Sequence, residues 1–366
     1  MTERDVTDDL PLLQLMMDDL REALAPFRPT NYWQYYERLV LPELQRKGLR
    51  GFRRRRDSAL EAFSAVDIVR PIVTLDHPIR TRLLNNAIGR RVPGWMRFWR
   101  WLKQQLPQPE ASVNEYLTPE VIRQLYFGYA EWRGRAAVHA RPLASVQMSC
   151  AGDPEDVFTV GGQRYSLSFV HQYLRYAFAS RFVDFDKLRL FVELGSGSGK
   201  QVELLRKLHP HVCYAIFDIP PQLYVAHQYL DAVFPASVVP YRRTREMTTL
   251  DNLEPGRIYV FGSGRFPILD TARIDLFWNV ASFQEMEPPV VRNYLSYVNR
   301  QADAVLLSEL MQGQQVTSRP GSKGVLERTT LEHYRTYLPD FALMDSAPGL
   351  PFSDSTDSFW GRRPAG

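Results

Sequence analysis

Three alternate glycines directly follow an acid near the middle of the chain, in the order Glu193, Gly195, Gly197 and Gly199. Residues 188–194 form a mostly apolar run, which is typical of a strand buried on both faces. Glycine adopts positive φ readily and lets a ligand approach the backbone closely. We therefore expect a buried strand, a glycine turn and then a helix over residues 200–208, whose free N–H groups favour a polar or anionic ligand group.

A second acid stands where the next strand should end. Asp218 follows the apolar run 212–217 and lies roughly 25 residues beyond Glu193, about the length of one βαβ repeat. A carboxylate at that strand end can accept hydrogen bonds from the ribose hydroxyls of an adenosine-type ligand. The alternative is an acid at a helix N-terminus, because Pro220 and Pro221 suit a first helical turn.

The spacing of the glycines separates two kinds of nucleotide cofactor. The dinucleotide fingerprint needs a glycine at the sixth position from Gly195, where this chain has Lys200. The observed order instead resembles the first motif of class I S-adenosylmethionine (SAM) methyltransferases, in which the glycines pass under the methionine part of SAM. A tight turn without a ligand is the alternative. The cofactor residues that we expect are Glu193, Gly195, Ser196, Gly197, Gly199, Asp218, Ile219 and Asn279.

The segment 275–286 would lie at the tip of the fourth strand, facing the methyl group. Together with the two motifs above, it resembles a family of sugar O-methyltransferases found with antibiotic deoxysugar and surface-polysaccharide genes, through an N-x-x-S-F-x-E-M pattern that begins at Asn279. Residues 48–53 resemble a short G-L-x-x-F-R element of the same family. Residues 218–223 also resemble a segment of plant-type small-molecule O-methyltransferases. A rough register puts Ser282 where those enzymes place a catalytic histidine.

Methyl transfer to a hydroxyl needs alignment and a base that takes the hydroxyl proton. Asn279 could hold the hydroxyl, and Glu285 could serve as the base or bind a sugar diol. For Glu285 the alternative is structural, because Ser282 and Glu285 fit a capping box before a helix. A histidine base would have to come from elsewhere. His171 ranks first, ahead of the other candidates His227 and His139, because its helix enters the strand before the glycine turn.

Composition bounds the remaining possibilities. The 366 residues are 45% hydrophobic and 12% aromatic, enough for one core domain with a substantial extension. No apolar run approaches the ~20 residues of a membrane span, and the N-terminus is acidic, so we expect a cytoplasmic protein without a membrane partner. Cys150 and Cys213 are too few for a disulfide framework or zinc site, and we expect both buried and no metal. The net charge of +4 is modest, and the arginine-rich run 50–56 is interpreted as a solvated helix end and not as a nucleic-acid site.

Alternating strands and helices predict an α/β fold with a Rossmann-like doubly wound sheet and a helical N-terminal region. We place the boundary near residue 150, between a helical substrate or lid region (1–150) and a SAM-binding domain (151–366), with a hairpin over 151–165 and irregular packing over 71–109. Expected helices cover residues 10–25, 32–45, 58–68, 118–137, 166–182, 200–208, 218–232 and 288–301. Further strands are expected over 274–278 and 304–308, with 238–241 or 257–262 as the third strand and an antiparallel pair at 341–344 and 358–360.

The predicted function is SAM-dependent O-methylation of a sugar hydroxyl, on a glycosylated natural product or a sugar nucleotide. The sugar class follows from the family resemblance alone. Two alternatives stay open: methylation of another small molecule at N, C or a phenolic oxygen, and a SAM-binding scaffold without catalysis. The expected partner is a small molecule and not a nucleic acid, and a homodimer is left open.

Overall fold

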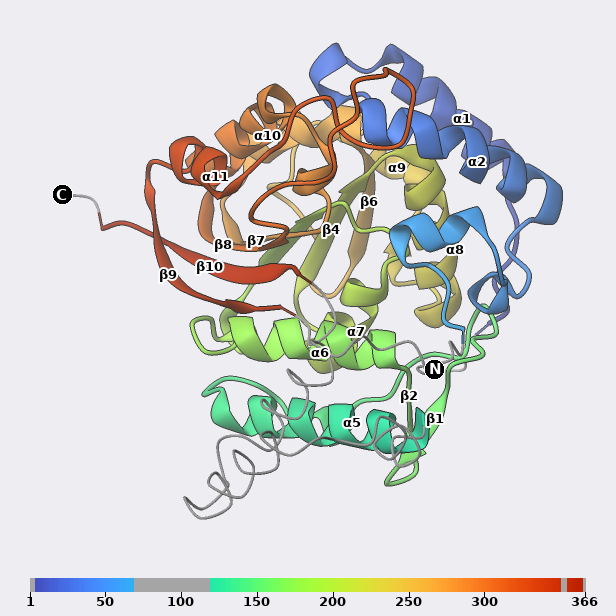
Figure 1. Ribbon diagram of the computed structural model, residues 1–366, viewed down its shortest axis with the longest axis vertical. Coiled ribbons are helices and arrows are strands. Elements are labelled where there is room, and N and C mark those ends of the chain that lie inside the picture. Colours follow the sequence, from blue (N-terminus) through green and yellow to red (C-terminus); the bar gives the residue numbers. More distant parts are fainter. Residues whose placement is uncertain (1–3, 69–118, 350–353, 365–366) are drawn as a thin grey trace, which may run out of the picture.

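The computed structural model describes residues 4–68, 119–349 and 354–364. Its centre is an eight-stranded sheet (Figure 1). The strands are β3 (Leu190–Leu194), β4 (Cys213–Asp218), β5 (Val238–Val239), β6 (Ile258–Gly262), β7 (Ile274–Val280), β8 (Ala302–Glu309), β9 (Phe341–Pro348) and β10 (Thr356–Arg362). Their order is β5-β6-β4-β3-β7-β8-β10-β9, and β10 runs antiparallel to both of its neighbours. This is the expected Rossmann-like doubly wound sheet, in which the order of successive strands reverses between β3 and β7.

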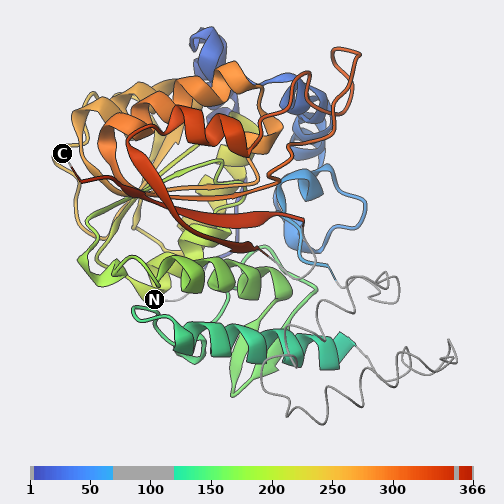
Figure 2. The same ribbon diagram turned by 60° about the vertical axis from the view of Figure 1, so that its left-hand side comes forward.

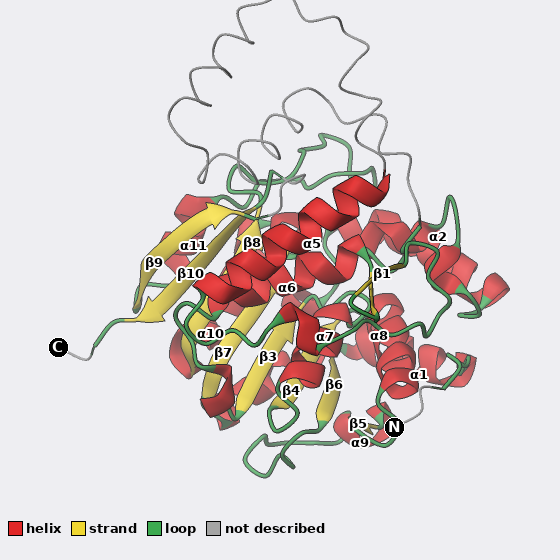
Figure 3. Cartoon of the chain, turned by 90° about the horizontal axis from the view of Figure 1, so that it is seen from below, coloured by secondary structure: helices red, strands yellow, loops and turns green. Residues whose placement is uncertain are grey.

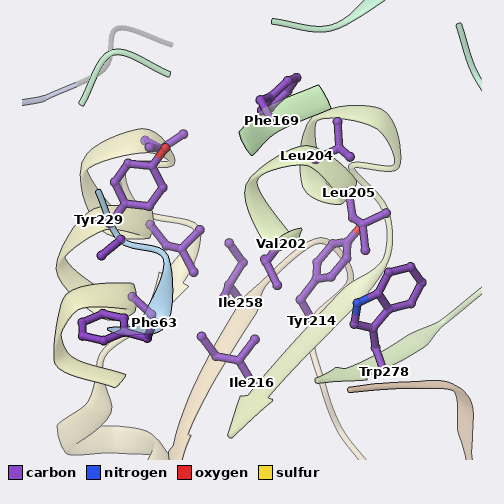
Figure 4. Close-up of a cluster of buried hydrophobic side chains, with 14 of the residues drawn as sticks. Phe63, Phe169, Val202, Leu204, Leu205, Tyr214, Ile216, Tyr229, Ile258 and Trp278 are labelled. Atoms are coloured by element: carbon purple, nitrogen blue, oxygen red, sulfur yellow. The ribbon is translucent and has the colours of Figure 1, made fainter. Parts of the chain in front are cut away.

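Both faces of the sheet are covered, which explains why its central strands are mostly apolar. Every residue of β3 and β4 is buried, and successive side chains enter two different cores: Phe191 packs on one face and Val192 on the other. Figure 4 shows the first core, where Val202 and Leu205 lie over Tyr214. Helices α6 (Leu167–Ala179), α7 (Lys200–Leu208) and α8 (Pro220–Val233) cover this face, and α10 (Pro288–Gln301) and α11 (Leu331–Tyr337) cover the other.

The N-terminal region is built around the same sheet. Helix α5 (Pro119–Ala136) lies outside α6 (Figure 3), while α1 (Leu10–Glu22) and α2 (Asn31–Lys47) lie beside α8 (Figure 1). The expected hairpin is present as β1 (Phe158–Val160) and β2 (Gln163–Tyr165). Side chains of α1, α2, α5 and α6 belong to one hydrophobic core. The division near residue 150 therefore stays a prediction, and it crosses a shared core.

Short helices complete the described ranges. They are α9 (Tyr241–Thr244) and the 3-10 helices Ala25–Phe27, Phe52–Arg54, Ala59–Phe63, Leu143–Ser145, Phe185–Lys187, Ser263–Thr271 and Phe283–Glu285. None of the helices in these ranges has the length and apolar character needed to cross a bilayer.

The structure settles several expectations about individual elements. Both candidates for the third strand are strands, with β6 next to β4 and β5 at the edge. The antiparallel pair near the C-terminus is confirmed. The helix expected over 58–68 is wrong beyond Phe63: Ser64 adopts a φ of 56°, and the Asp67 N–H then donates to the Arg53 carbonyl instead of continuing a helix. The segment 71–109 and residue 118, where the helix expected over 118–137 would begin, lie outside the described residues.

Two expectations about polar residues are wrong. The arginine-rich run is not a solvated helix end at Arg53, because that side chain is 1% exposed and its Nε donates to Asp67 Oδ2 over 2.8 Å. The Arg53 guanidinium can be buried because it is paired with the Asp67 carboxylate. Arg54 is exposed, so its charge needs no such compensation. Cys213 is buried as expected, whereas Cys150 is exposed.

Candidate active site

A cavity of about 190 Å³ lies at the carboxyl ends of β3, β4 and β7, where doubly wound sheets bind ligands. The glycine turn after β3 forms one side of it. Residues of α2, the segment 62–64, α6 and the loop after β7 line the rest. Figures 1 and 2 show the N-terminal segments, in blue, beside this end of the sheet. The N-terminal region therefore contributes directly to the cavity.

The three glycines of the turn have φ values of 78°, 55° and 81°, a backbone conformation that side chains disfavour. A Cβ at Gly195 would lie 2.3 Å from the Ser282 Cβ, and one at Gly199 would lie 2.9 Å from Leu230 Cδ1. Packing therefore requires glycine at these two positions with or without a ligand. The turn alone does not identify its function, and the surrounding side chains have to be considered.

Asp218 closes the turn from the neighbouring strand. Its Oδ2 accepts the Gly197 N–H and its Oδ1 accepts the Ile219 N–H, both over 2.8 Å. The N-cap of α8 is Ile219, so Asp218 also stands directly before the N-terminus of that helix, as the structural alternative expected. Its carboxyl lines the cavity, and burial raises the pKa of Asp218 to about 7. Each carboxylate oxygen keeps a second acceptor position for a ligand hydroxyl.

Several buried polar atoms that line the cavity have no hydrogen-bond partner. They are Glu193 Oε2, Ser196 Oγ, Gln201 Oε1 and both side-chain polar atoms of Gln222. Folded proteins pair nearly all such atoms, so a group of them around one cavity marks the place of a polar ligand. Burial, and then the charge of Asp218, raise the pKa of Glu193 to about 8. Sequence reasoning missed Gln201 and Gln222, although both occupy first turns of helices that follow the predicted strands.

Arg175 is a cavity residue that the sequence did not reveal. It is 8% exposed and projects from α6, where its Nε donates to Ser308 Oγ and its Nη1 to Gln172 Oε1, both over 3.2 Å. Its positive charge opposes the rise in the pKa of Glu193. The available signal was an arginine among apolar residues in the middle of the expected helix 166–182.

The segment 62–64 is held beside the turn by a buried cation. Lys200, the first residue of α7, donates from Nζ to the Ser64 carbonyl over 2.7 Å and lies 2.7 Å from Asp67 Oδ2. Asp67 also accepts from Arg53, so one carboxylate serves two cations. Burial raises the pKa of Asp67, but the two positive charges outweigh it and keep that pKa below its usual range. This side of the cavity is therefore fixed by charge as well as by packing.

Glu285 lines the cavity from the loop after β7. Its Oε2 accepts the Trp33 Nε1–H over 2.8 Å. The capping-box interpretation is wrong, because Ser282 makes no side-chain cap to the 3-10 helix that follows it. Burial raises the pKa of Glu285 well above its usual range, while the hydrogen bond from Trp33 lowers it.

Asn279 does not have the expected roles. It is fully buried, and the cavity lining does not include it. Its Nδ2 donates to the Leu194 carbonyl over 2.8 Å and to Ser282 Oγ over 3.1 Å, while its Oδ1 accepts the Phe283 N–H over 3.1 Å. These bonds join the tip of β7 to β3, so the amide has a structural use and is not free to hold a substrate or the cofactor.

No histidine in the described ranges lines this cavity. His171 lines a neighbouring cavity of about 450 Å³, its ring lies 5.3 Å from that of Tyr126, and burial lowers its pKa to about 3. His227 Nδ1 is within hydrogen-bond distance of Gln228 Oε1 on α8. His139 lies on the segment after α5, outside the cavity lining. The structure thus gives no support to a histidine base.

Ionisable side chains of both signs line the cavity. Three carboxyl groups line it, from Glu193, Asp218 and Glu285. The cations of the lining are Arg28, Arg175 and Lys200, of which Lys200 is paired with Asp67. Across residues 4–68, 119–349 and 354–364, no group of three or more histidine, cysteine, aspartate or glutamate side chains could hold a metal ion.

Comparison with known proteins gives matches to solved structures only; no family model and no curated protein matches. The narrower resemblance to sugar O-methyltransferases is therefore not confirmed. The pyocyanin biosynthetic protein PhzM aligns at 16% identity over 54% of this chain and 57% of its own, with a TM-score of 0.37. The mitomycin 7-O-methyltransferase MmcR aligns at 14% identity over 52% and 57%, with a TM-score of 0.35.

A third similar structure is magnesium protoporphyrin IX methyltransferase (ChlM) from Synechocystis PCC 6803 with bound SAH, at 12% identity over 67% of this chain and 100% of its own, with a TM-score of 0.37. The aligned part thus spans less than two thirds of PhzM and of MmcR. At these identities and TM-scores the similarities carry no conclusion about activity. The activity has to be argued from the site itself.

Proposed function

We propose that this protein is a SAM-dependent O-methyltransferase. One observation carries the proposal: unpaired buried polar atoms surround a single cavity that is bounded by the glycine turn after β3 and by Asp218 at the end of β4. The carboxyl groups of that cavity suit a ligand that carries positive charge on a sulfonium and an ammonium group. Bound SAM would supply an electrophilic methyl group and a neutral thioether as the leaving group.

The residues present fit each part of that cofactor. Asp218 keeps acceptor positions for ribose hydroxyls. Glu193 offers an unpaired carboxylate oxygen to an ammonium group. Arg175, on the α6 side of the cavity, offers a guanidinium to a carboxylate. Ser196, Gln201 and Gln222 contribute neutral polar atoms that remain to be satisfied.

Glu285 is the residue that we assign to the acceptor hydroxyl. It is the acid of the cavity lining that comes from the loop after β7. An ionised Glu285 would take the hydroxyl proton as the oxygen attacks the methyl group, which is general-base catalysis. The rest of the rate enhancement would come from alignment of the acceptor in the cavity.

A sugar is the acceptor class that we propose. The side chains of Trp33 and Phe63, with ring centroids 6.3 Å apart, line the cavity together with Glu285. An aromatic surface beside a carboxylate suits a sugar ring, whose C–H face is apolar and whose hydroxyls donate hydrogen bonds. Incubation with candidate acceptors and mass spectrometry for the gain of one methyl group tests this assignment. Methylation of flat phenols but of no sugar would replace the sugar class and leave methyl transfer intact.

The cofactor assignment is tested by thermal unfolding with SAM, S-adenosylhomocysteine (SAH) and NAD. A ligand that binds only the folded protein raises the melting temperature by mass action. We expect SAM and SAH to raise it and NAD to leave it unchanged. Stabilisation by NAD alone would refute the methyltransferase assignment.

A truncated ligand tests the cofactor tail separately. 5′-Methylthioadenosine lacks the amino-acid group of SAH, so we expect wild-type protein to bind it roughly tenfold or more weakly, one charge-assisted contact being worth about 1.5–3 kcal/mol. Arg175→Gln should reduce this preference for SAH, whereas Arg164→Gln, at an exposed position on β2, should keep it. If calorimetry shows that Arg175→Gln prefers SAH over 5′-methylthioadenosine as strongly as wild type does, the assignment of Arg175 to the cofactor site would be refuted.

A further inference from the structure

The first turn of α2 is fixed to two loops that follow it by more than 250 positions. Thr30 Oγ1 donates to the Glu285 carbonyl over 2.8 Å. Asn31 Nδ2 donates to the carbonyls of Ser322 and Gly324 over 3.0 and 2.7 Å, and its Oδ1 accepts the Gly321 N–H over 2.7 Å. The turn therefore has a fixed position relative to Glu285 before any side chain of the cavity is considered.

Trp33, on that turn, makes the direct contact with the Glu285 carboxyl. The indole is 8% exposed and packs against Tyr36 and Phe63, with ring centroids 5.7 and 6.3 Å away. An indole N–H can donate a hydrogen bond but cannot accept one. At 2.8 Å from Oε2 it therefore favours a carboxylate over a protonated carboxyl that would present its own O–H at that oxygen.

We infer that Trp33 is a positioning residue for Glu285, which orients the carboxyl in the cavity and favours its ionised form. This goes beyond the proposed function, because it assigns helix α2 a role in orienting the Glu285 carboxyl and not only in enclosing the cavity. The inference rests on the proposed function in one respect, the assignment of Glu285 as the proton acceptor.

The surroundings of Glu285 make such a donor necessary. The charges of Glu309 on β8 and Asp218 on β4 raise the pKa of Glu285 in addition to burial, and both reach it from the sheet. From α2, hydrogen bonds from Trp33 and Tyr32 lower that pKa. A protonated Glu285 could not accept a proton, and the two donors from α2 oppose the effects of burial, Glu309 and Asp218 on its pKa.

A titration of Glu285 tests the inference in cofactor-free protein. Carbon-13 at the glutamate carboxyl reports ionisation by NMR, and Glu285→Gln identifies the Glu285 signal by its loss. In Trp33→Phe the midpoint should rise by about one pH unit, the value of one hydrogen bond to a charged group. Trp132→Phe, on α5 and outside the cavity lining, should leave the midpoint unchanged. An unchanged midpoint in Trp33→Phe would overturn the inference.

A second measurement needs no altered Trp33. In the unmodified protein, the indole N–H signal that Glu285→Gln displaces should titrate with the same midpoint as the Glu285 carboxyl. An indole signal that ignores this titration would overturn the inference even if Trp33→Phe does not fold. Because both titrations omit the cofactor, their outcome is separate from SAH binding. Failure to bind SAH would instead refute the proposed function.

Discussion

The two sides of the cavity are assembled in different ways. On the side that we propose for the cofactor, called the cofactor side below, the key contact joins Gly197 to Asp218, which are 21 positions apart. On the side that we propose for the acceptor, called the acceptor side below, the key contact joins Trp33 to Glu285, which are 252 positions apart. The first contact follows from one βαβ unit, whereas the second requires the whole fold. A motif in the sequence can therefore specify the cofactor side but not the acceptor side.

The largest effect is expected at the cofactor side, from Gly195→Ala. The new Cβ would lie 2.3 Å from Ser282 Cβ at a φ of 78°, so we expect a loss of about 3 kcal/mol in the free energy of unfolding from the combined strain and overpacking. Displacement of the turn should also weaken SAH binding roughly a hundredfold. Gly161→Ala is the control, because its φ is 58° but nothing lies within 4 Å of the new Cβ. Equal effects in chemical denaturation and calorimetry would show that the contact with Ser282 is unimportant.

The next effect tests the acid that closes the turn. Asp218→Ala removes the acceptor for the Gly197 and Ile219 N–H groups along with any bond to a ribose. We expect SAH affinity to fall roughly ten- to a hundredfold, as for one or two hydrogen bonds to a charged group. Asp251→Ala, at an exposed position, should have no effect. Wild-type affinity in Asp218→Ala would refute the ribose assignment.

A smaller effect on SAH binding is expected from Asn279→Ala. This variant tests whether Asn279 has a structural role or contacts the cofactor. Asn279→Ala removes three buried hydrogen bonds and should cost about 2–3 kcal/mol of stability. At a temperature where the destabilised variant is still folded, its affinity for SAH should lie within about threefold of the wild-type affinity. A threefold change in affinity corresponds to well under 1.4 kcal/mol. Loss of SAH affinity in the folded variant would restore Asn279 to the cofactor site.

The smallest effect is the pH dependence of stability in cofactor-free protein. Burial raises the pKa of Glu193 to about 8 in the folded state, so the folded protein keeps a proton that the unfolded chain releases. The resulting stabilisation is full below the unfolded pKa of about 4.3 and is lost as the pH rises through about 8. Glu193→Gln should therefore flatten the fall in melting temperature between about pH 6 and 8. A parallel fall in the two proteins would show that Glu193 does not hold a proton there.

The sequence predicted the sheet well because its information is local. Apolar runs that end in an acid located β3 and β4, and alternation of strands and helices predicted the parallel order. The same reasoning failed at Asn279, since its partners Leu194 and Ser282 come together only after β7 has paired with β3. It also failed at Arg175, since a buried arginine looks like any other helix residue until its partners are known.

Trp33 shows the limit most clearly. Its aromatic neighbours on α2 are equally consistent with core packing, and the sequence contains nothing that links them to Glu285. His171 shows the reverse error. Proximity in the sequence to the strand before the glycine turn made it a candidate, yet its ring lines a different cavity.

The shared carboxylate of Asp67 has a consequence for how the protein is made. Ser64 and Lys200 are 136 positions apart, so a growing chain carries Asp67 and Arg53 long before the second cation emerges from the ribosome. Until then the early segment lacks the ammonium group that anchors it. The contact that holds the segment 62–64 beside the glycine turn can therefore form only after residue 200 has been synthesised.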